Sequence, residues 1–395
     1  SCDERGILEN SNDVSYIYFT KNATNDSTST SFFFYPEGDI SVPVAMSLSG
    51  KMFDEDLLWY RRGKYKLGIS LLNALNSDSK YSYIGYQYNK AEELQWILKF
   101  LEKNVPQYKR FDIRIYTVFI SDVRAVKKDC KYYLGKKIFL PSENLEMYIK
   151  HKNLSINDYG WLSMINWRIK SYSDYLLRDV DLSLGFTKIN NEKYLRFPAW
   201  IYYKNFFPAD ATYATIKKIV ENVNSSRSLR KRECICINNH DAFGLRTKIA
   251  DDLNGMFDIT YAGRWRNNTS ELWDKYGNDK LKYMNLFKFN ICPENMDSPY
   301  YCTEKIFDSF RAGCIPIYAG ALNNPEPDVI NKDAVIFWNL DGDNTDNIKL
   351  IKKLNTDDNF YDKFMQQEKL LPSAAEYVYD RFIKLENKFK EILDD

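Results

Sequence analysis

Continuous apolar runs that alternate with helix-forming segments between residues 233 and 339 constrain the fold of this chain most strongly. The runs lack the polar alternation of a strand that has one face in water, so both faces of each strand are expected to be covered. Buried strands joined by helices are typical of a parallel sheet with helices on both faces. The runs are ECICIN (233–238), FDITYAG (257–263), LFKFNIC (286–292), CIPIYAG (314–320) and DAVIFWN (333–339). The pattern predicts an α/β domain in this part of the chain.

A less regular α/β pattern precedes this domain. The segment AEELQWILKFLEKN (91–104) is expected to form a helix, because its apolar residues recur at helical spacing. A polar and basic stretch, VNSSRSLRKR (223–232), has the composition of the end of a linker. Strands are expected in FDIRIYTVFIS (111–121), KKIFLP (136–141) and LSLGF (182–186).

The length of the chain indicates more than one domain. At about 150 residues per domain, 395 residues correspond to two or three domains. We predict an N-terminal α/β domain over residues 1–204, a linker over 205–232, a C-terminal domain over 233–370 and a helix over 371–395. The two α/β domains are expected to face each other across a cleft.

Composition and charge restrict the class of protein. The 44% hydrophobic and 28% charged fractions are ordinary for a soluble globular protein. A net charge of +1 argues against a nucleic-acid-binding protein, which normally carries a basic excess. No apolar stretch approaches the roughly 18 residues of a membrane helix. The terminal segment LENKFKEILDD (385–395) is amphipathic, and we expect it to pack on the protein, with peripheral membrane contact as the alternative.

The cysteines favour a reducing compartment. Their odd number, 7, and their irregular spacing do not fit a disulfide framework. Cys234, Cys236 and Cys292 lie in predicted strands, where a free cysteine packs as a small apolar residue. We therefore expect a cytoplasmic protein, with or without membrane association. The sequence begins at Ser1 rather than Met, so the Golgi lumen is the alternative if an N-terminal anchor was removed.

A metal site is not expected. The two histidines, His151 and His240, are too few for a histidine-based zinc site or a Ser-His-Asp triad, and their polar surroundings predict exposure. Two Asp-x-Asp triplets, at 179–181 and 341–343, contain paired carboxylates of a kind that suits Mg²⁺ or Mn²⁺. The first triplet precedes a predicted strand and the second follows one. Solvated or turn roles are expected for both triplets, and metal binding is the alternative.

The segment TEKIFDSFRA (303–312) is expected to be a helix that opens at the carboxyl edge of the C-terminal sheet. Thr303 is a good N-cap, because its hydroxyl can accept a bond from a free N–H of the first turn. Gly313 stands just past the end of the helix, as a C′ glycine does. The apolar side chains of the expected buried face are Ile306, Phe307 and Phe310.

Glu304 and Lys305 occupy the first turn of this helix. A helix N-terminus carries partial positive charge and free N–H donors, and Lys305 adds a full charge. Ligands of α/β proteins bind at the carboxyl edge of the sheet, and a nucleotide diphosphate fits this electrostatic environment. Glu304 would then be free to accept hydrogen bonds from ribose hydroxyls. The alternative is that both are solvated first-turn residues without a ligand.

The order of motifs across this region closely resembles that of the α1,3/4-fucosyltransferases, family 10 of the glycosyltransferases. The motifs are K-F-N-x-x-x-E-N, then Y-x-T-E-K-I-x-D, then I-P-I-Y-x-G. Upstream, FGLRTKIADDLN (243–254) is similar to the arginine-bearing helix of the family, and LPSEN (140–144) is similar to its G-E-N motif. The segment YLRFP (194–198) is also similar to a segment of the family. The resemblance covers about residues 133–340 and is greater to bacterial members than to animal ones.

The resemblance implies a GT-B fold, in which two Rossmann-like domains face each other across a cleft. The N-terminal domain would receive the acceptor, and the C-terminal domain would hold GDP-fucose. The implied reaction is an inverting transfer of L-fucose to a hydroxyl of a glycan acceptor, which is an oligosaccharide, polysaccharide or glycoconjugate, with an α1,3-type linkage. No cofactor and no obligatory metal are implied, since cationic side chains would neutralise the diphosphate.

The resemblance also implies roles for individual residues. Glu143 resembles the general base that takes the proton of the acceptor hydroxyl. Arg246 and Lys305 resemble the diphosphate clamp, which offsets the charge on the departing GDP. Glu304 resembles the ribose ligand. The donor pocket would further be lined by Tyr301, Glu294 and Asn295.

Several residues depart from the family pattern. Ser142 replaces the usual glycine before Glu143, and the neighbouring Glu146 is an alternative base. Pro293 and Ala319 replace aromatic residues beside the expected donor pocket. The same fold acting on another sugar nucleotide, and a non-catalytic glycan-binding relative, are therefore the alternative functions.

Overall fold

A computed structural model describes residues 92–118, 123–156 and 158–394, together with short strands that precede residue 92. Five of these early strands form an antiparallel sheet, β1–β2–β3, and a hairpin, β4–β5. They are β1 (Ile17–Lys21), β2 (Ser29–Phe34), β3 (Met46–Ser49), β4 (Leu58–Arg61) and β5 (Lys64–Leu67). Within the described residues, no helix has both the length and the apolar character needed to cross a membrane.

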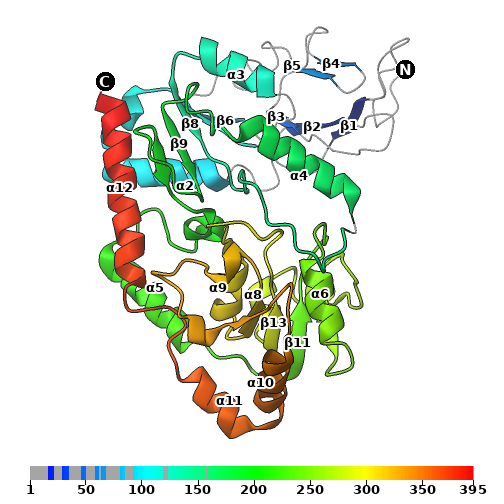
Figure 1. The fold of residues 1–395 in the computed structure, drawn as a ribbon. Coiled ribbons are helices and arrows are strands. Elements are labelled where there is room, and N and C mark those ends of the chain that lie inside the picture. The colour runs from blue at the N-terminus through cyan, green and yellow to red at the C-terminus, as the bar shows by residue number, and fades with distance from the viewer. Residues whose placement is uncertain are drawn as a thin grey trace.

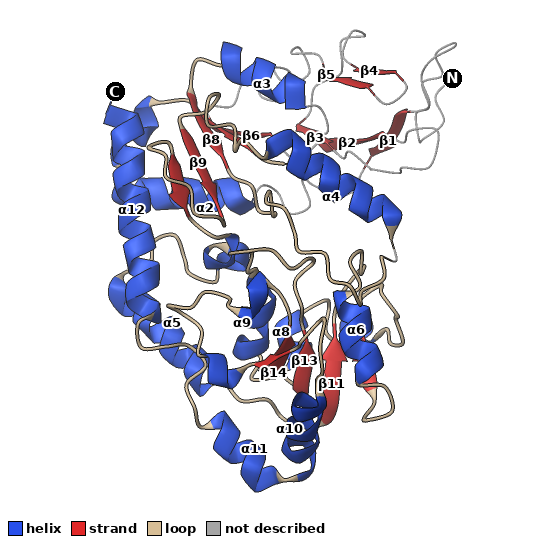
Figure 2. Cartoon of the chain, viewed as in Figure 1, coloured by secondary structure: helices blue, strands red, loops and turns tan. Residues whose placement is uncertain are grey.

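A parallel five-stranded sheet forms the centre of the N-terminal part of the chain, in the order β10–β9–β8–β7–β6. Every residue of β7 and β9 is buried, which is typical of strands covered on both faces. The strands are β6 (Tyr81–Ile84), β7 (Ile113–Tyr116), β8 (Lys136–Phe139), β9 (Leu182–Gly185) and β10 (Tyr194–Arg196). The helices around this sheet are α2 (Glu92–Asn104), α3 (Val123–Tyr132) and α4 (Tyr159–Tyr172) (Figure 2).

A second parallel sheet, in the order β12–β11–β13–β14–β15, forms the centre of the C-terminal part. Its strands are β11 (Arg232–Cys236), β12 (Ile259–Tyr261), β13 (Phe287–Ile291), β14 (Ile315–Tyr318) and β15 (Ile336–Phe337). The predicted parallel sheet is confirmed, and each strand is shorter than the apolar run that predicted it. The helices are α5 (Tyr213–Ser225), α6 (Leu245–Asp252), α7 (Glu271–Asp274), α8 (Lys280–Met284), α9 (Glu304–Arg311), α10 (Thr345–Thr356), α11 (Asp358–Met365) and α12 (Ala374–Asp394). Short 3-10 helices are η1 (Pro106–Arg110), η2 (Ala199–Ile201), η3 (Tyr203–Asn205), η4 (Ala321–Asn323) and η5 (Lys332–Ala334).

Pro316 lies inside β14, where a proline is unusual because it cannot donate to the ladder. The carbonyl groups of Ile317 and Ala319 face β13, where they accept bonds from Cys292 and Glu294. Backbone groups alternate in direction along a strand, so the nitrogen of Pro316 faces the β15 side. The paired part of β15 begins only opposite Ile317. The proline is tolerated because its missing N–H falls beyond the paired part of β15.

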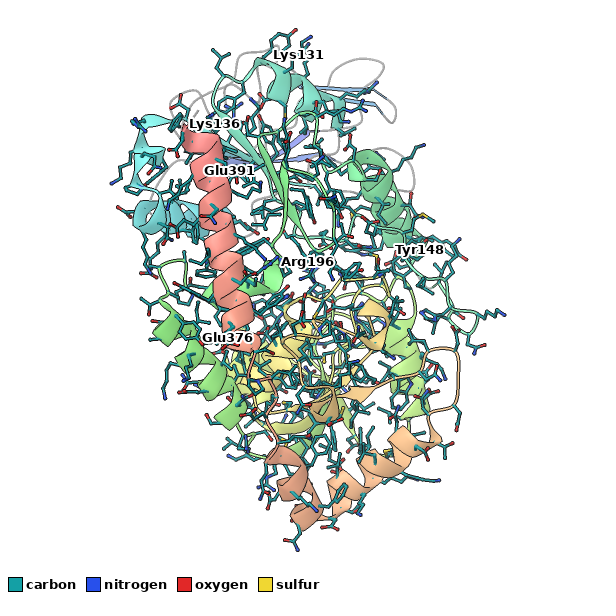
Figure 3. All side chains as sticks on the ribbon, turned by 60° about the vertical axis from the view of Figure 1, so that its left-hand side comes forward. Lys131, Lys136, Tyr148, Arg196, Glu376 and Glu391 are labelled. Carbon is teal, nitrogen blue, oxygen red and sulfur yellow. The ribbon has the colours of Figure 1, made fainter. Side chains whose placement is uncertain are left out.

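The C-terminal helix α12 joins the two parts of the molecule, and it confirms the helix predicted there. It runs along one side of the molecule beside α5 and α2 (Figure 1). Phe382 of α12 packs edge-on against Trp96 of α2, with ring centroids 5.6 Å apart. Arg196, which is labelled in Figure 3, lies at the end of β10. It forms an ion pair of 2.6 Å with Glu326 of the C-terminal part, and it also donates to the Tyr377 hydroxyl of α12.

The apolar core is continuous between the two sheets. Trp200, which follows β10, stacks on Phe307 of α9 with ring centroids 4.3 Å apart. Phe307, Ile306 and Phe310 are all buried, as predicted for this face of α9. The segment 205–232 contains α5, which packs against α9 and α12. The mouth of α9 is therefore held by packing from both parts of the chain.

Candidate active site

The mouth of α9 is organised by Glu294 rather than by the N-cap side chain. Thr303 occupies the N-cap position, but its side chain makes no capping bond to the first turn. Its hydroxyl and its backbone N–H instead donate to the Glu294 carboxylate at 2.7 and 2.8 Å. The predicted N-cap position of Thr303 is confirmed, but the predicted capping bond was wrong, because the hydroxyl donates to a buried carboxylate. Gly313, with φ +77°, follows the helix as the predicted C′ glycine.

Glu294 is fully buried, and the protein itself uses both of its carboxylate oxygens. Oε1 accepts from the Thr303 N–H and from the Tyr318 hydroxyl, the second at 3.2 Å. Oε2 accepts from the Thr303 hydroxyl and from Lys305 Nζ, the second at 3.3 Å. A buried carboxylate is stable only with such partners. Glu294 therefore lies beneath the helix mouth and fixes the position of Lys305.

Glu304 and Lys305 lie side by side in the first turn of α9. Their side chains are 28% and 18% exposed, and Lys305 Nζ lies 3.9 Å from Glu304 Oε1. Burial opposes the charge on Lys305, but Glu304 and Glu294 outweigh this effect and raise the pKa of the lysine. Burial likewise opposes the charge on Glu304, but Lys305 and the backbone N–H of Glu304 itself lower the pKa of this carboxyl. Both side chains are therefore charged at neutral pH and partly accessible.

Helix α6 brings Arg246 to the same region. The turn before α6 is held by Asp241, whose carboxylate accepts the N–H groups of Arg246 and Thr247 at 3.2 and 2.7 Å. The buried guanidinium donates to the His240 carbonyl oxygen at 2.5 Å and to Asn295 Oδ1 at 2.7 Å. Burial lowers the pKa of Arg246, but a guanidinium stays charged in proteins. Its Nε donor is buried without a partner among the described residues.

Glu143 lies in the loop that follows β8, and it reaches across to the C-terminal part of the chain. The Tyr301 hydroxyl, from the loop before α9, donates to Glu143 Oε2 at 3.3 Å. The neighbouring Glu146 instead accepts from the Tyr175 hydroxyl at 3.3 Å, and both of these residues belong to the N-terminal part. Of the two carboxylates considered as a base, Glu143 is therefore the one that contacts the mouth of α9.

The predicted site residues meet at the junction of the two parallel-sheet domains. Burial, followed by the charges of Glu143, Glu294 and Glu304, raises the pKa of Tyr301 far above its ordinary value. The hydroxyl of Tyr301 therefore stays protonated and donates to Glu143. The site combines the Lys305 cation, the buried Arg246 cation and a helix N-terminus with a carboxylate of the other domain. Such an arrangement can bind a phosphate-bearing ligand next to a proton acceptor.

Comparison with known families agrees with this arrangement. The family model "Glycosyltransferase family 10 (fucosyltransferase) C-term" matches residues 226–383. This range covers most of the C-terminal domain, which is therefore similar to glycosyltransferase family 10. The resemblance carried by the motifs around Lys305 is therefore confirmed.

The chain is also similar to individual proteins. It is 26% identical to the alpha-(1,3)-fucosyltransferase FucT of Helicobacter pylori over 314 residues, which are 70% of this chain and 57% of that protein. The chain thus spans somewhat more than half the length of this curated relative. Its structure resembles solved alpha1,3-fucosyltransferases without ligand (TM-score 0.52, 19% identity) and with GDP-fucose (TM-score 0.50, 20% identity). Each match covers 80% of this chain and 90% of the solved one, and the GT-B fold is thereby confirmed.

Two residues near the candidate site were not singled out by the sequence. Arg168 and Trp161 lie on α4, and Arg168 Nη1 lies 3.6 Å from Glu143 Oε2. Trp161 stacks on the ring of His240, with centroids 4.1 Å apart and an interplanar angle of 11°. Arg168 follows Trp161 by seven residues, which places both on one face of a helix. That spacing is the signal in the sequence by which they could have been found.

The prediction that both histidines are exposed was wrong. Burial, followed by the charges of Arg246, Lys305 and Arg168, lowers the pKa of His240 to about 3, so its imidazole is neutral. His151 lies between two carboxylates, 2.9 Å from Asp297 and 2.7 Å from Asp341. Neither environment is visible in the sequence, because both partners of each histidine come from other segments.

The carboxylates of the two Asp-x-Asp triplets have partners within the protein. Asp181 accepts from the Lys137 N–H at 2.6 Å, and Asp341 pairs with His151 and accepts from the Lys152 N–H at 2.9 Å. Among the described residues, no group of three or more His, Cys, Asp or Glu side chains is arranged to hold a metal ion. The described cysteines are free and buried, and Cys2 lies outside the described residues.

Proposed function

We propose that this chain is an inverting fucosyltransferase, which transfers L-fucose from GDP-fucose to a hydroxyl of a glycan acceptor in an α1,3-type linkage. The match to the family 10 model and the name of the Helicobacter pylori relative support this donor and this linkage. The observation that carries the proposal is the contact between Tyr301 and Glu143. Through this contact, a carboxylate of the N-terminal domain lies at the mouth of the helix that bears Lys305.

The proposed donor site uses the cations at the α9 mouth. Lys305 Nζ has three donors, and within the protein it contacts Thr303 Oγ1 at 2.9 Å and Glu294 at 3.3 Å. A third N–H is therefore available to a phosphate oxygen. The unpartnered Nε of Arg246 supplies another donor nearby. Glu304 lies next to Lys305 with an accessible carboxylate that suits the ribose hydroxyls.

The proposed reaction is a single displacement. The acceptor hydroxyl oxygen attacks the anomeric carbon of fucose and forms the new glycosidic bond, while the bond from that carbon to the GDP phosphate oxygen breaks. The acceptor proton passes to the carboxylate of Glu143. The electron pair of the broken bond remains on GDP, where Lys305 and Arg246 offset the added charge. Attack from the face opposite GDP inverts the anomeric configuration.

We infer that this reaction needs no metal ion, because two cationic side chains and a helix N-terminus serve the same electrostatic purpose. The acceptor side is the N-terminal domain, which carries Glu143. The acceptor is accordingly a glycan, either as an oligosaccharide, a polysaccharide or a glycoconjugate.

The structure gives little support to the alternative that the chain uses a sugar nucleotide other than GDP-fucose. Pro293 and Ala319 are both buried, and Ala319 accepts a backbone bond from Glu294. These residues shape the layer beneath the site rather than its exposed lining. A non-catalytic glycan-binding role would leave the contact of Glu143 with Tyr301 unexplained.

Donor turnover in the presence of EDTA tests the proposal. The full chain is incubated with GDP-fucose and a panel of glycan acceptors, and fucosylated product and its anomeric configuration are measured by NMR. Replacement Glu143→Gln should lower kcat by about 10²-fold or more, the usual contribution of a general base. Glu146→Gln, which removes the neighbouring carboxylate, is the matched control and should retain activity. Turnover of a UDP-sugar alone, product of retained configuration, or full activity of Glu143→Gln would contradict the proposal.

A further inference from the structure

Helix α4 contacts both the donor side of the proposed site and the strand that precedes the proposed base. Its first turns point toward α6 of the C-terminal domain, and its last turns lie against the N-terminal sheet (Figure 1). At the first end, Trp161 stacks on His240, whose carbonyl oxygen accepts a bond from Arg246. At the other end, Tyr172 stacks on Phe139 of β8 with centroids 5.6 Å apart. The helix is thus fixed both to the donor side and to the strand that precedes Glu143.

Arg168 projects from α4 onto the carboxylate of Glu143. Its Nη1 lies 3.6 Å from Glu143 Oε2, and the two side chains are 9% and 25% exposed. An ion pair that is this little exposed is screened less than a surface pair. The charge of Arg168 also reaches the rest of the site. It adds to the effects of burial, Arg246 and Lys305 that lower the pKa of His240, and it partly offsets the burial that raises the pKa of Tyr301.

The two partners of Glu143 contact the same oxygen. Tyr301 donates to Oε2 from the C-terminal domain, and Arg168 approaches Oε2 from the N-terminal domain. The carboxylate of the proposed base is therefore approached from both domains.

We propose that Arg168 is a positioning residue for Glu143: together with Tyr301, it holds the carboxylate in the orientation in which it takes the proton of the acceptor hydroxyl. This inference rests on the proposed function, because it assigns Arg168 to the base of that reaction. The rigid fork of the guanidinium fixes the orientation of that carboxylate better than a lysine can.

The test compares the kcat and KM values of Arg168→Met, Arg168→Lys and the matched control Lys170→Met. Lys170 is exposed on the same helix, so its replacement removes one positive charge without touching Glu143. In Arg168→Met, kcat should fall by about 10–100-fold, because the carboxylate loses its fixed orientation. The KM for GDP-fucose should stay within about twofold of wild type, because Arg168 lies on the base rather than on the donor clamp. Arg168→Lys should restore only part of the lost kcat, because a lysine lacks the rigid fork.

The outcomes distinguish a failure of the positioning role of Arg168 from a failure of the proposed function. A kcat of Arg168→Met equal to that of wild type, a loss confined to KM for GDP-fucose, or an equal loss of kcat in Lys170→Met would overturn the positioning role while wild-type turnover leaves the proposed function intact. If Arg168→Met fails to fold, as judged by loss of GDP binding, Arg168→Lys decides alone: a kcat equal to wild type refutes the role. Absence of fucose transfer by the wild-type chain would refute the proposed function and this role with it.

Discussion

Gly320 packs directly against the buried side chain of Glu294. A Cβ atom on Gly320 would lie 2.7 Å from Glu294 Cγ and 2.9 Å from its Cβ, and the glycine has φ +146°. The turn after β14 therefore leaves room for the carboxylate that fixes Lys305. This close approach explains why the apolar run of β14 must end in a glycine.

Gly320→Ala should destabilise the protein by about 2–4 kcal/mol, because it combines backbone strain with overpacking against Glu294. Gly255→Ala is the matched control, since Gly255 also has positive φ (+77°) but a Cβ there meets nothing within 4 Å. The control should cost about 1 kcal/mol. Denaturant unfolding measures both values, and equal losses would show that Glu294 does not press on Gly320.

Glu294→Ala should lower the free energy of unfolding by about 3–5 kcal/mol, because it leaves Lys305 without its buried partner. It should also weaken GDP binding, since the start of α9 loses the acceptor of the Thr303 N–H. Glu192→Ala, at an exposed loop position, is the control and should change stability by no more than about 0.5 kcal/mol. Unaltered stability and GDP affinity of Glu294→Ala would show that Glu294 does not fix the position of Lys305 and the start of α9.

Tyr301→Phe should lower kcat by about 5–10-fold, because one hydrogen bond to the proposed base is lost. GDP affinity should change little, since the aromatic ring and its packing on Phe186 are kept. Tyr300→Phe, at the exposed neighbouring position, provides the control. Steady-state kinetics with separate kcat and KM values make the measurement, and a loss confined to KM for the donor would place Tyr301 in donor binding.

His240 makes stability depend on pH in a defined direction. The folded state holds its pKa at about 3, below the unfolded value of 6.5, mainly because of burial. The stability that this neutral histidine contributes is present above about pH 6.5 and is lost as the pH falls toward about 3. His240→Phe, which keeps a ring beside Trp161, should therefore lose less stability than wild type between about pH 7.5 and 4.5. The difference is at most about 3 kcal/mol. If the free energy of unfolding depended on pH equally in the two proteins, this assignment would be contradicted.

Much of the C-terminal domain was predictable from local sequence. The continuous apolar runs predicted the buried strands of a parallel α/β unit, and Gly313 marked the end of α9, because these signals depend on burial and backbone geometry of nearby residues. The motif resemblance singled out Arg246, Glu304 and Lys305, which lie on the helices α6 and α9. The structure places Arg246 next to Asn295, and Lys305 next to Glu304.

The interactions between distant segments were not predictable from local sequence. Thr303 satisfies the pattern of a side-chain cap, and only the folded structure shows that Glu294, nine residues earlier, takes its hydroxyl. The exposure expected for His240 failed because its burial comes from Trp161, on a helix of the other domain. Polar residues alone do not reveal which segment will cover them. The position of Arg168 on Glu143 was missed for the same reason.

The most direct test of the account is a calorimetric titration of the full chain with GDP-fucose in EDTA. The account predicts binding of GDP-fucose and GDP, no comparable binding of UDP-galactose or UDP-glucose, and a loss of affinity of about 10–100-fold in Lys305→Met. Lys349→Met, which removes a largely exposed lysine of α10, should bind as wild type does. Failure of GDP-fucose to bind, or equal affinity in Lys305→Met, would contradict the assignment of the α9 mouth as the donor site.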